Sequence, residues 1–272
     1  MVLLIILLVS ALMALCILRL GLYSALPLVL TLILISVYLV KDVSIIPLSC
    51  VIVTGVMAFV LRVTRNLSLV LVLTPFIVVL WMLILSLFAD VYLEKIFSQA
   101  KESFLEFESQ VLENAEANDN KEAVENFFTQ LPELSSSLML GYIALIQMIL
   151  GLSSLFFARS LQSRLYNPDG WRREFHGLRF TKAGMLILLL GILGCKYFID
   201  YQYGIWLFAL PLVIAGLAIV HSYIYVNKFS GYWLFGFYIL LLAFAPLIMS
   251  ILILLVIIDY WICLRRRLES VK

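Results

Sequence analysis

The stretch RLYNPDGWRREFHGLRF, residues 164–180, holds the densest group of side chains that could do chemistry. It contains four arginines and a histidine, in a chain of 272 residues that is 64% hydrophobic and only 13% charged. Guanidinium groups offer forked donors that fit phosphate or carboxylate, and histidine can move a proton or bind a metal. Two hypotheses follow: a site that clamps an anion, or a basic collar that touches anionic lipid headgroups.

This stretch supplies most of the candidate binding residues, which are Arg164, Tyr166, Asn167, Trp171, Arg172, Glu174, His176 and Arg179. Residues 167–170, Asn-Pro-Asp-Gly, form a strong turn signal, because proline fixes one dihedral and glycine accepts the left-handed conformation. Trp171, Phe175 and Leu178 then recur at helical spacing, which predicts a short helix with an apolar stripe. We expect this helix to lie in the membrane interface beside anionic headgroups, an interpretation that the charge pattern favours over the anion clamp.

Three polar residues outside this stretch, and one histidine inside it, are further candidates. His176 lacks the partner spacing of a metal site, so a polar interface histidine is favoured over a general base or a ligand. His221 falls within an apolar run, where a polar side chain usually faces the bundle interior. A packing role and a ligand contact are equally open for it. Gln147 is a candidate interhelical hydrogen-bond donor, and Asp259 is placed to neutralise one of the arginines at 265–267.

The motifs of the common catalytic and metal sites are absent from the sequence. It has no P-loop, no G-x-S-x-G elbow, no paired carboxylates within an apolar run and no metal-ligand cluster. The four cysteines lie inside apolar runs without metal or redox spacing. We expect no catalytic residue, metal or cofactor, and therefore no enzyme. Nucleic-acid binding is not expected either, because the basic residues border apolar runs.

The elements that position these residues are long apolar runs. The mean hydropathy is +1.10, and the runs cover residues 2–18, 22–40, 43–61, 67–89, 137–158, 183–199, 203–226 and 231–264. In lipid each must be helical, because an unmade backbone hydrogen bond there is costly. The fold class is therefore an all-α polytopic transmembrane helix bundle, with residues 1–272 as a single transmembrane domain. The last run would reach about 51 Å as one helix, so we expect a break near Ala245 and Pro246.

The distribution of lysine and arginine predicts the number of spans and their direction. Eight spans would divide these residues 10 to 9 between the two sides, whereas nine spans place 14 of the 19 on one side. Positive residues concentrate in cytoplasmic loops. We therefore expect nine spans in a bacterial inner membrane, with residues 159–182 as a cytoplasmic basic interfacial loop. The C-terminus is expected in the cytoplasm and the N-terminus outside.

Residues 90–134 form the largest non-membrane segment and are expected outside the cytoplasm. They carry eleven acidic residues against three lysines. Apolar residues between Leu93 and Val111 repeat at helical spacing, and a second apolar face follows between Ala123 and Leu131. The segment is therefore expected to be an amphipathic helical hairpin. A hairpin lying at the membrane surface is favoured over a lid or a docking hairpin for a partner protein. Tyrosines and tryptophans flanking the later runs, Tyr225 among them, are typical of headgroup anchors.

Residues 155–180 resemble the YybS-like family of uncharacterised bacterial membrane proteins. The family pattern is an apolar span ending in Ala-Arg, followed by L-Y-N-P-G-G-aromatic-R-E-E-F-H-x-L-R. The sequence matches it at Ala158-Arg159, Leu165-Tyr166-Asn167-Pro168, Gly170-Trp171-Arg172, Glu174-Phe175-His176 and Leu178-Arg179. It departs at Asp169, where the family has glycine, and at Arg173, where the family often has glutamate. The ending Asp259-Tyr260-Trp261 before three arginines is similar too, and the resemblance runs from about residue 10 to the end.

The resemblance implies a function by analogy. The family is similar in helical plan to the S components of energy-coupling-factor transporters, which bind a solute and borrow an ATPase. We therefore expect a solute-binding or transport-related membrane component without its own ATPase. No ligand site is carried over from the family; in this interpretation the inner helices hold His221, Gln147 and neighbouring aromatic residues around a small molecule. Gly184, Gly191 and Gly194 are a weak counterpart of the small-residue motifs by which S components meet their partner. The alternative is a membrane scaffold whose acidic hairpin docks an envelope protein.

Overall fold

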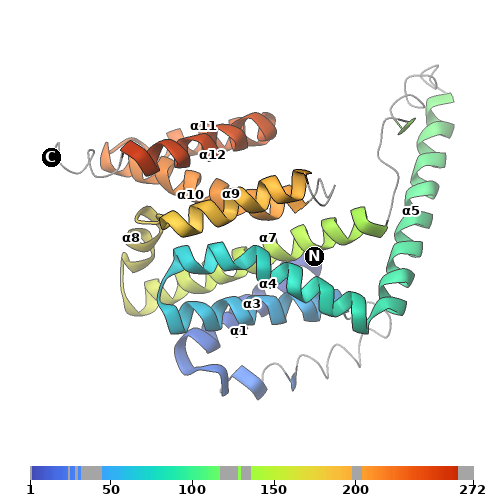
Figure 1. The fold of residues 1–272 in the computed structure, drawn as a ribbon, viewed down its shortest axis with the longest axis horizontal. Coiled ribbons are helices and arrows are strands. Elements are labelled where there is room, and N and C mark those ends of the chain that lie inside the picture. Colours follow the sequence, from blue (N-terminus) through green and yellow to red (C-terminus); the bar gives the residue numbers. More distant parts are fainter. Residues whose placement is uncertain are drawn as a thin grey trace. The chain divides into compact units, whose positions relative to one another are not determined.

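The described part of the chain consists of helices joined by short turns, and none of these residues lies in a strand. A computed structural model describes residues 2–23, 25–27, 30–31, 45–116, 128–129, 136–197 and 204–262. Its helices are α1 (Val2–Leu20), α3 (Ile45–Thr64), α4 (Leu67–Phe88), α5 (Asp90–Glu116), α7 (Ser136–Tyr166), α8 (Gly170–His176), α9 (Lys182–Tyr197), α10 (Gly204–Val226), α11 (Tyr232–Ala243) and α12 (Ala245–Ile262) (Figure 1). Six of them are long and apolar enough to cross a membrane. The all-α class expected of a multi-pass membrane protein is confirmed.

The number of spans stays a prediction. Most of the expected run at residues 22–40 lies outside the described residues. The run at 183–199 contains α9, whose 16 residues are fewer than an ordinary span uses. The last run forms two helices rather than one. The described residues therefore supply six long apolar helices, and the expected eight or nine spans are not reached among them.

The expected break in the last apolar run is present. Helix α11 ends at Ala243, and Phe244 has the non-helical dihedrals φ −127° and ψ 43°. Helix α12 starts at Ala245, so Pro246 occupies its first turn, where a missing amide donor costs little. The 12 residues of α11 cover about 18 Å, which is less than the thickness of a bilayer core. Helix α11 is thus a short return segment before α12.

The chain divides into two compact units. The first contains residues 1–78 and 145–272, and the second contains residues 79–144. In the first unit, α1 packs along α3, and α10 contacts α8, α9, α11 and α12. Helix α10 is the most buried of these elements, since more than half of its residues are buried. Helix α10 is therefore the central helix of the group that carries the candidate site.

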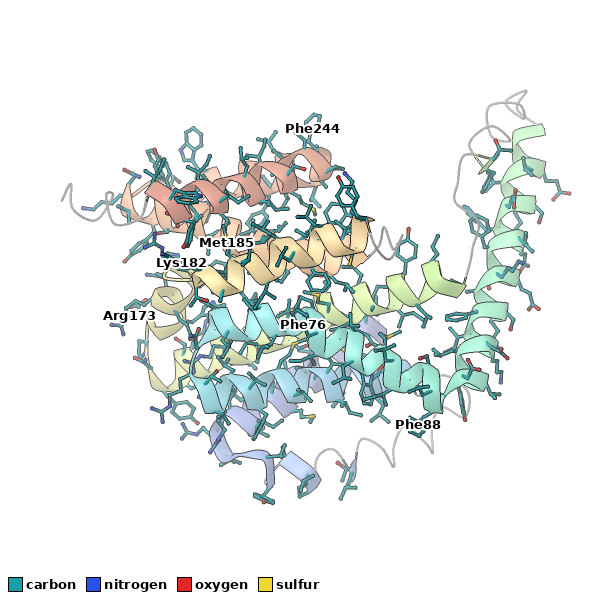
Figure 2. The ribbon with its side chains drawn as sticks, in the orientation of Figure 1. Phe76, Phe88, Arg173, Lys182, Met185 and Phe244 are labelled. Carbon is teal, nitrogen blue, oxygen red and sulfur yellow. The ribbon has the colours of Figure 1, made fainter. Side chains whose placement is uncertain are left out.

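Basic residues gather at one end of the first unit. Arg62 at the end of α3 donates to the Ile17 carbonyl near the end of α1, which places these two helix ends together. Among the described residues of this unit, every lysine and arginine except Lys196 lies near this end. Figure 2 shows Arg173 and Lys182 there and Phe244, at the turn before α12, at the opposite end. This one-sided pattern is the one that the charge count predicts, while its direction across the membrane stays a prediction.

Small and polar residues join α7 to α1 and α3. The buried amide of Gln147 donates to the Ser49 hydroxyl at 2.6 Å, and the Ser154 hydroxyl donates to the Leu7 carbonyl at 3.1 Å. The first bond is the interhelical hydrogen bond expected for Gln147. Gly151 lies between the two contacts, where a Cβ would be 3.4 Å from the Thr54 hydroxyl and 3.5 Å from the Met57 side chain of α3. Polar groups inside the bundle thus bond to one another rather than facing lipid.

The three glycines of α9 were expected to make close contacts with neighbouring helices, and two of them do. A Cβ on Gly184 would lie 2.9 Å from Val72 of α4, and one on Gly191 would meet the ring of Phe208 of α10. Gly194 has no atom within 4 Å of its Cβ position. A closer approach occurs on α10, where a Cβ on Gly216 would lie 2.7 Å from the Leu252 Cβ and 2.8 Å from its carbonyl oxygen. Glycine at 216 therefore permits the contact between α10 and α12.

The second unit contains the first arm of the expected acidic hairpin. Helix α5 runs for 27 residues, with Leu93 buried and Phe97 and Phe104 half-buried on the expected apolar face. Phe107, assigned to the same face, is exposed. Phe104 and Phe107 contact Phe128, with ring centroids 6.1 and 6.5 Å apart. Most of the second arm lies outside the described residues, so the hairpin and its extracytoplasmic position stay predictions.

The α10 contact with α12 generates a stability prediction. Replacing Gly216 with alanine should lower the free energy of unfolding by about 1–3 kcal/mol, because the added methyl overpacks a contact with backbone. Gly194→Ala is the matched control: its methyl meets open space, and alanine in a helix is favoured by about 1 kcal/mol. Unfolding midpoints in mild detergent measure both. Equal midpoints for the two variants would show that α10 and α12 do not approach as closely as described.

Candidate functional site

The basic loop between α7 and α9 begins with a turn held by one hydroxyl group. The buried Ser163 hydroxyl donates to the Asn167 carbonyl at 2.9 Å and accepts the backbone N–H of Trp171 at 3.0 Å. Asp169 takes the left-handed conformation, with φ 64°, which aspartate tolerates better than most residues. Helix α8 then starts at Gly170. The turn and short helix predicted from the sequence are both present, but Asp169 takes the left-handed conformation that the sequence predicts for Gly170. Asn167 contributes to the turn through its carbonyl.

The apolar stripe of α8 packs against protein. Trp171 stacks on Phe175 with ring centroids 5.6 Å apart, and both contact Phe156 of α7. Phe175 also meets His221 of α10 edge-on at 5.7 Å. Leu178, just past the helix, is buried. Helix α8 therefore packs between α7 and α10. The sequence led us to expect an apolar stripe in the membrane interface, whereas the structure packs this stripe against protein.

An ion pair fixes the other side of α8 to α7. The Arg159 Nε lies 2.8 Å from the Glu174 Oε2, and both side chains are mostly buried, at 33% and 20% exposed. Arg159 also donates to the Gln162 side chain at 2.7 Å. Glu174, expected as a binding residue, therefore has an anchoring role. The neighbouring pair of Arg172 with Asp169 is longer, at 3.3 Å, and exposed.

Arg179 ties the end of this loop to α12. Its Nε lies 3.7 Å from the Asp259 Oδ2, and its Nη2 donates to the Asp259 carbonyl at 3.3 Å. The Asp259 side chain is only 4% exposed, so the guanidinium balances a buried carboxylate. The expected partners of Asp259, the arginines at 265–267, lie outside the described residues. The structure instead gives it a partner 80 positions earlier in the chain.

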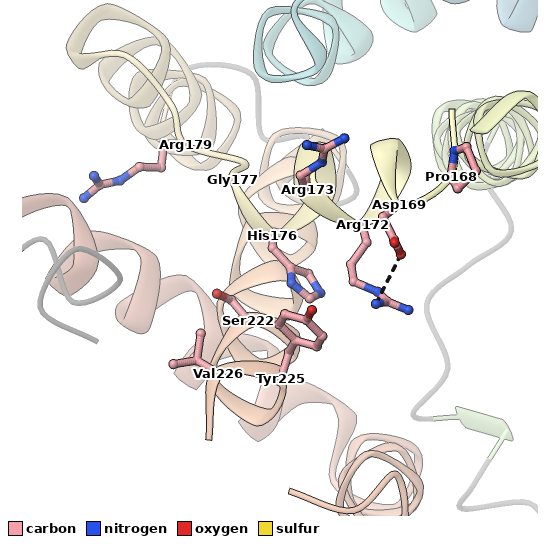
Figure 3. A pocket seen from close by; sticks show the side chains of 10 residues that line it. All are labelled: Pro168, Asp169, Arg172, Arg173, His176, Gly177, Arg179, Ser222, Tyr225 and Val226. Atoms are coloured by element: carbon pink, nitrogen blue, oxygen red, sulfur yellow. Dashed lines mark ion pairs between the residues drawn. The ribbon is translucent and has the colours of Figure 1, made fainter. Parts of the chain in front are cut away.

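A basic pocket of about 710 Å³ lies between α8 and the end of α10. It is lined by Pro168, Asp169, Arg172, Arg173, His176, Gly177, Arg179, Ser222, Tyr225 and Val226 (Figure 3). The His176 ring lies 5.3 Å from that of Tyr225, and the Arg172 guanidinium lies 5.1 Å above the same tyrosine. In Figure 3, Arg173 and Arg179 point away from this cluster. The lining contains three arginines and one carboxylate, so the positive charge of the pocket favours an anion.

An apolar pocket of about 430 Å³ adjoins the basic one. It is lined by Phe156, Trp171, Arg172, Phe175, His176, Ile214, Leu217, His221 and Tyr238. His221 Nε2 and the Tyr238 hydroxyl are hydrogen-bonded at 2.9 Å. Arg172 and His176 line both pockets. We call the first the basic pocket and the second the aromatic pocket.

The structure gathers some of the expected binding residues and separates others. Arg172, His176 and Arg179 line the basic pocket, while Trp171 and His221 line the aromatic pocket. The other expected binding residues lie outside both pockets: Arg164, Tyr166, Asn167, Glu174, Gln147 and Asp259. Arg164 is exposed, and Tyr166 packs under Arg19, whose guanidinium carbon lies 3.4 Å from the ring centroid. The other four make the contacts described above. Of these, Gln147 belongs to the contact between α7 and α3.

Sequence reasoning missed Tyr225, Ser222 and Tyr238. The one signal that could have found Tyr225 is its spacing from His221, four residues on, which puts both on the same side of α10. Tyr225 was instead expected to be a headgroup anchor. Tyr238 lies on α11 and carries no local signal of its contact with His221.

A second basic hollow, of about 350 Å³, lies where α1, α3 and α7 end. Its arginines are Arg19, Arg62, Arg65 and Arg159. Three of them have structural contacts: Arg62 bonds the end of α1, Arg159 holds Glu174, and Arg19 packs on Tyr166. This hollow therefore serves the fold first, and the basic pocket is the better candidate site.

Comparisons with other proteins and a search for metal ligands add no assignment. No family model, curated protein or solved structure matches the chain. Among the described residues, no three histidine, cysteine, aspartate or glutamate side chains are grouped so as to hold a metal ion. Function is therefore argued from the geometry of the two pockets.

Two of the three ion pairs described for this loop differ in exposure, and this difference gives a quantitative prediction. A double-mutant cycle with Arg159→Met and Glu174→Gln should give a coupling energy of about 1–2 kcal/mol, because that charge-assisted bond is short and mostly buried. The same cycle with Arg172→Met and Asp169→Asn should give about 0–0.5 kcal/mol, because that pair is exposed. Unfolding free energies of all variants in mild detergent provide the test. Equal couplings would mean that α8 is not anchored through Arg159.

Proposed function

We propose that the protein is a solute-binding membrane component that holds an anionic group in the basic pocket. One observation carries the proposal: Arg172 and His176 of α8 converge with Tyr225 of α10 around a pocket that three arginines and a single carboxylate line. A phosphate or carboxylate is the chemical group that such a lining recognises, because a guanidinium can donate two parallel bonds to it.

The existing contact of Arg172 leaves room for a ligand. Its partner Asp169 is 65% exposed and Arg172 itself is 51% exposed, at a separation of 3.3 Å. An exposed pair of this kind contributes about 0–1 kcal/mol, so an incoming anion can replace it at small cost. Arg179, by contrast, balances the buried Asp259 and is expected to keep that role. Arg172 is therefore the principal anion ligand in this proposal.

The chain is proposed to work as a component rather than as a complete transporter. Its sequence has no P-loop, and the resemblance to the YybS-like family and to S components supports a part that borrows energy from a partner. The proposed location is a bacterial inner membrane, with the basic pocket on the cytoplasmic side, where positive residues concentrate. Anionic headgroups of the inner leaflet would surround the pocket.

This orientation predicts the outcome of reporter fusions. A reporter active only in the cytoplasm should be active after Lys272, and one active only outside it should be active after Leu134. The reason is that residues 90–134 are acidic, whereas the segments expected in the cytoplasm, including the C-terminal segment, are basic. Finding both fusion points on one side of the membrane would exclude the proposed topology.

Binding of a simple anion tests the proposed site. Equilibrium dialysis with labelled methyl phosphate should show saturable binding to the detergent-purified protein, and Arg172→Gln should weaken it about tenfold, or about 1.4 kcal/mol. Arg164→Gln is the matched control, because it removes the same charge from an exposed position of the same loop, outside the pocket. Equal affinities for the two variants would place the anion elsewhere.

The same purification separates the proposal from the scaffold alternative. A solute-binding component should carry a small molecule or an ATPase through mild detergent. A stable membrane partner that co-purifies with a chain lacking measurable anion affinity would favour the scaffold, docked through α5.

A further inference from the structure

The two pockets beside α8 share two lining residues. Arg172 and His176 line both, so the two pockets are neighbours and one ligand in contact with these residues is within reach of each. We propose that the natural ligand is an anionic amphiphile, with a phosphate or carboxylate head in the basic pocket and an apolar body in the aromatic pocket. This inference rests on the proposed function, because it assigns the substrate class of the same site.

Helix α8 has two chemically different faces beside the pockets. Arg172 and His176 are four residues apart and lie beside Tyr225 of α10 (Figure 3). Trp171 and Phe175, also four residues apart, turn toward Phe156 of α7. One face of α8 is therefore ionic and the adjacent face, about 100° around the helix, is aromatic. A ligand that contacts both faces must itself be polar at one end and apolar at the other.

The aromatic pocket is suited to hydrocarbon although it contains a histidine. His221 and Tyr238 are bonded to each other at 2.9 Å, and Phe175 covers the His221 ring edge-on. A hydrocarbon that binds beside them does not displace water from an unpaired polar group, so it avoids that group's desolvation free energy. Apart from Arg172 and His176, which it shares with the basic pocket, the remaining lining is aromatic or aliphatic, with Ile214 and Leu217 from α10.

The order of the pockets along α10 matches the order of a lipid in a bilayer. Ile214, Leu217 and His221 line the aromatic pocket, and the later residues Ser222, Tyr225 and Val226 line the basic pocket. Helix α10 is a candidate span that ends at Val226. From Leu217 to Tyr225 the helix rises about 12 Å. Polarity therefore increases from the interior of the span toward its basic end, and an amphiphile would lie with its head at the surface and its body inside.

A chain-length series tests the inference. Methyl, hexyl and decyl phosphate are titrated into the full chain in nanodiscs of zwitterionic phosphatidylcholine, with empty nanodiscs measured to subtract partition into lipid. The affinity should rise at least about tenfold from methyl to decyl phosphate, because each added methylene leaves water. Arg172→Gln should weaken the binding of all three probes by a similar factor.

Filling the aromatic pocket provides the decisive variant. Leu217→Trp places a larger side chain in that pocket from a half-buried position, so it should abolish the gain in affinity from methyl to decyl phosphate. Leu242→Trp is the control, because Leu242 is 83% exposed on α11 and lines neither pocket. Leu217→Ala provides a second readout that does not depend on accommodating tryptophan, and it should reduce the chain-length gain.

Each remaining outcome contradicts a distinct statement. Binding of methyl phosphate that depends on Arg172 but shows no chain-length gain would overturn the amphiphile inference and leave the proposed function standing. A chain-length gain that Leu217→Trp and Leu242→Trp leave equally intact would place the apolar body elsewhere and also overturn the inference. No saturable binding of any of the three probes would overturn the inference and the proposed function together.

Discussion

The bilayer interior cannot solvate an unpaired charge or an unbonded backbone group, and the rest of this structure follows from that constraint. Within the described spans, several polar side chains bond to one another, as Gln147 does through its amide nitrogen with Ser49 and His221 does with Tyr238. Among the described residues of the first unit, the basic ones collect at one end, with Lys196 apart. A site that recognises an anion can therefore form only where the helices reach this end.

The loop between α7 and α9 forms the basic pocket at that charged end, together with the end of α10. Without fixed contacts, a segment so rich in arginine would lie loosely among headgroups. Here the Ser163 hydroxyl fixes the turn, the Arg159 ion pair holds one side of α8, and Arg179 ties the loop to the buried Asp259 of α12. These contacts commit some charges to the fold and leave Arg172 beside Tyr225 with only an exposed partner. Arg159 and Arg179 therefore stabilise the fold, whereas Arg172 lines the basic pocket, where we propose that it contacts an anion.

Features with local signals were predictable from the sequence, and features built by tertiary contact were not. Apolar runs predicted the helices, Pro246 marked the break between α11 and α12, and residues 167–170 marked the turn before α8. The pairing of Arg179 with Asp259 joins residues 80 positions apart, and Tyr238 reaches His221 from another helix, so no periodicity reveals either contact. Gly194 shows the same limit: its spacing suggests a close helix contact, yet only its neighbours Gly184 and Gly191 on α9 have one.

The central claim is that the basic and aromatic pockets hold one anionic amphiphile, and native mass spectrometry of the intact chain tests it most directly. The protein would be released in the gas phase from membranes of the cells that produce it, and any retained molecule fragmented. The account predicts a bound mass that yields a phosphate or carboxylate headgroup and an apolar body. A retained water-soluble anion without an apolar part, or a chain that keeps only neutral or zwitterionic lipid, would contradict it.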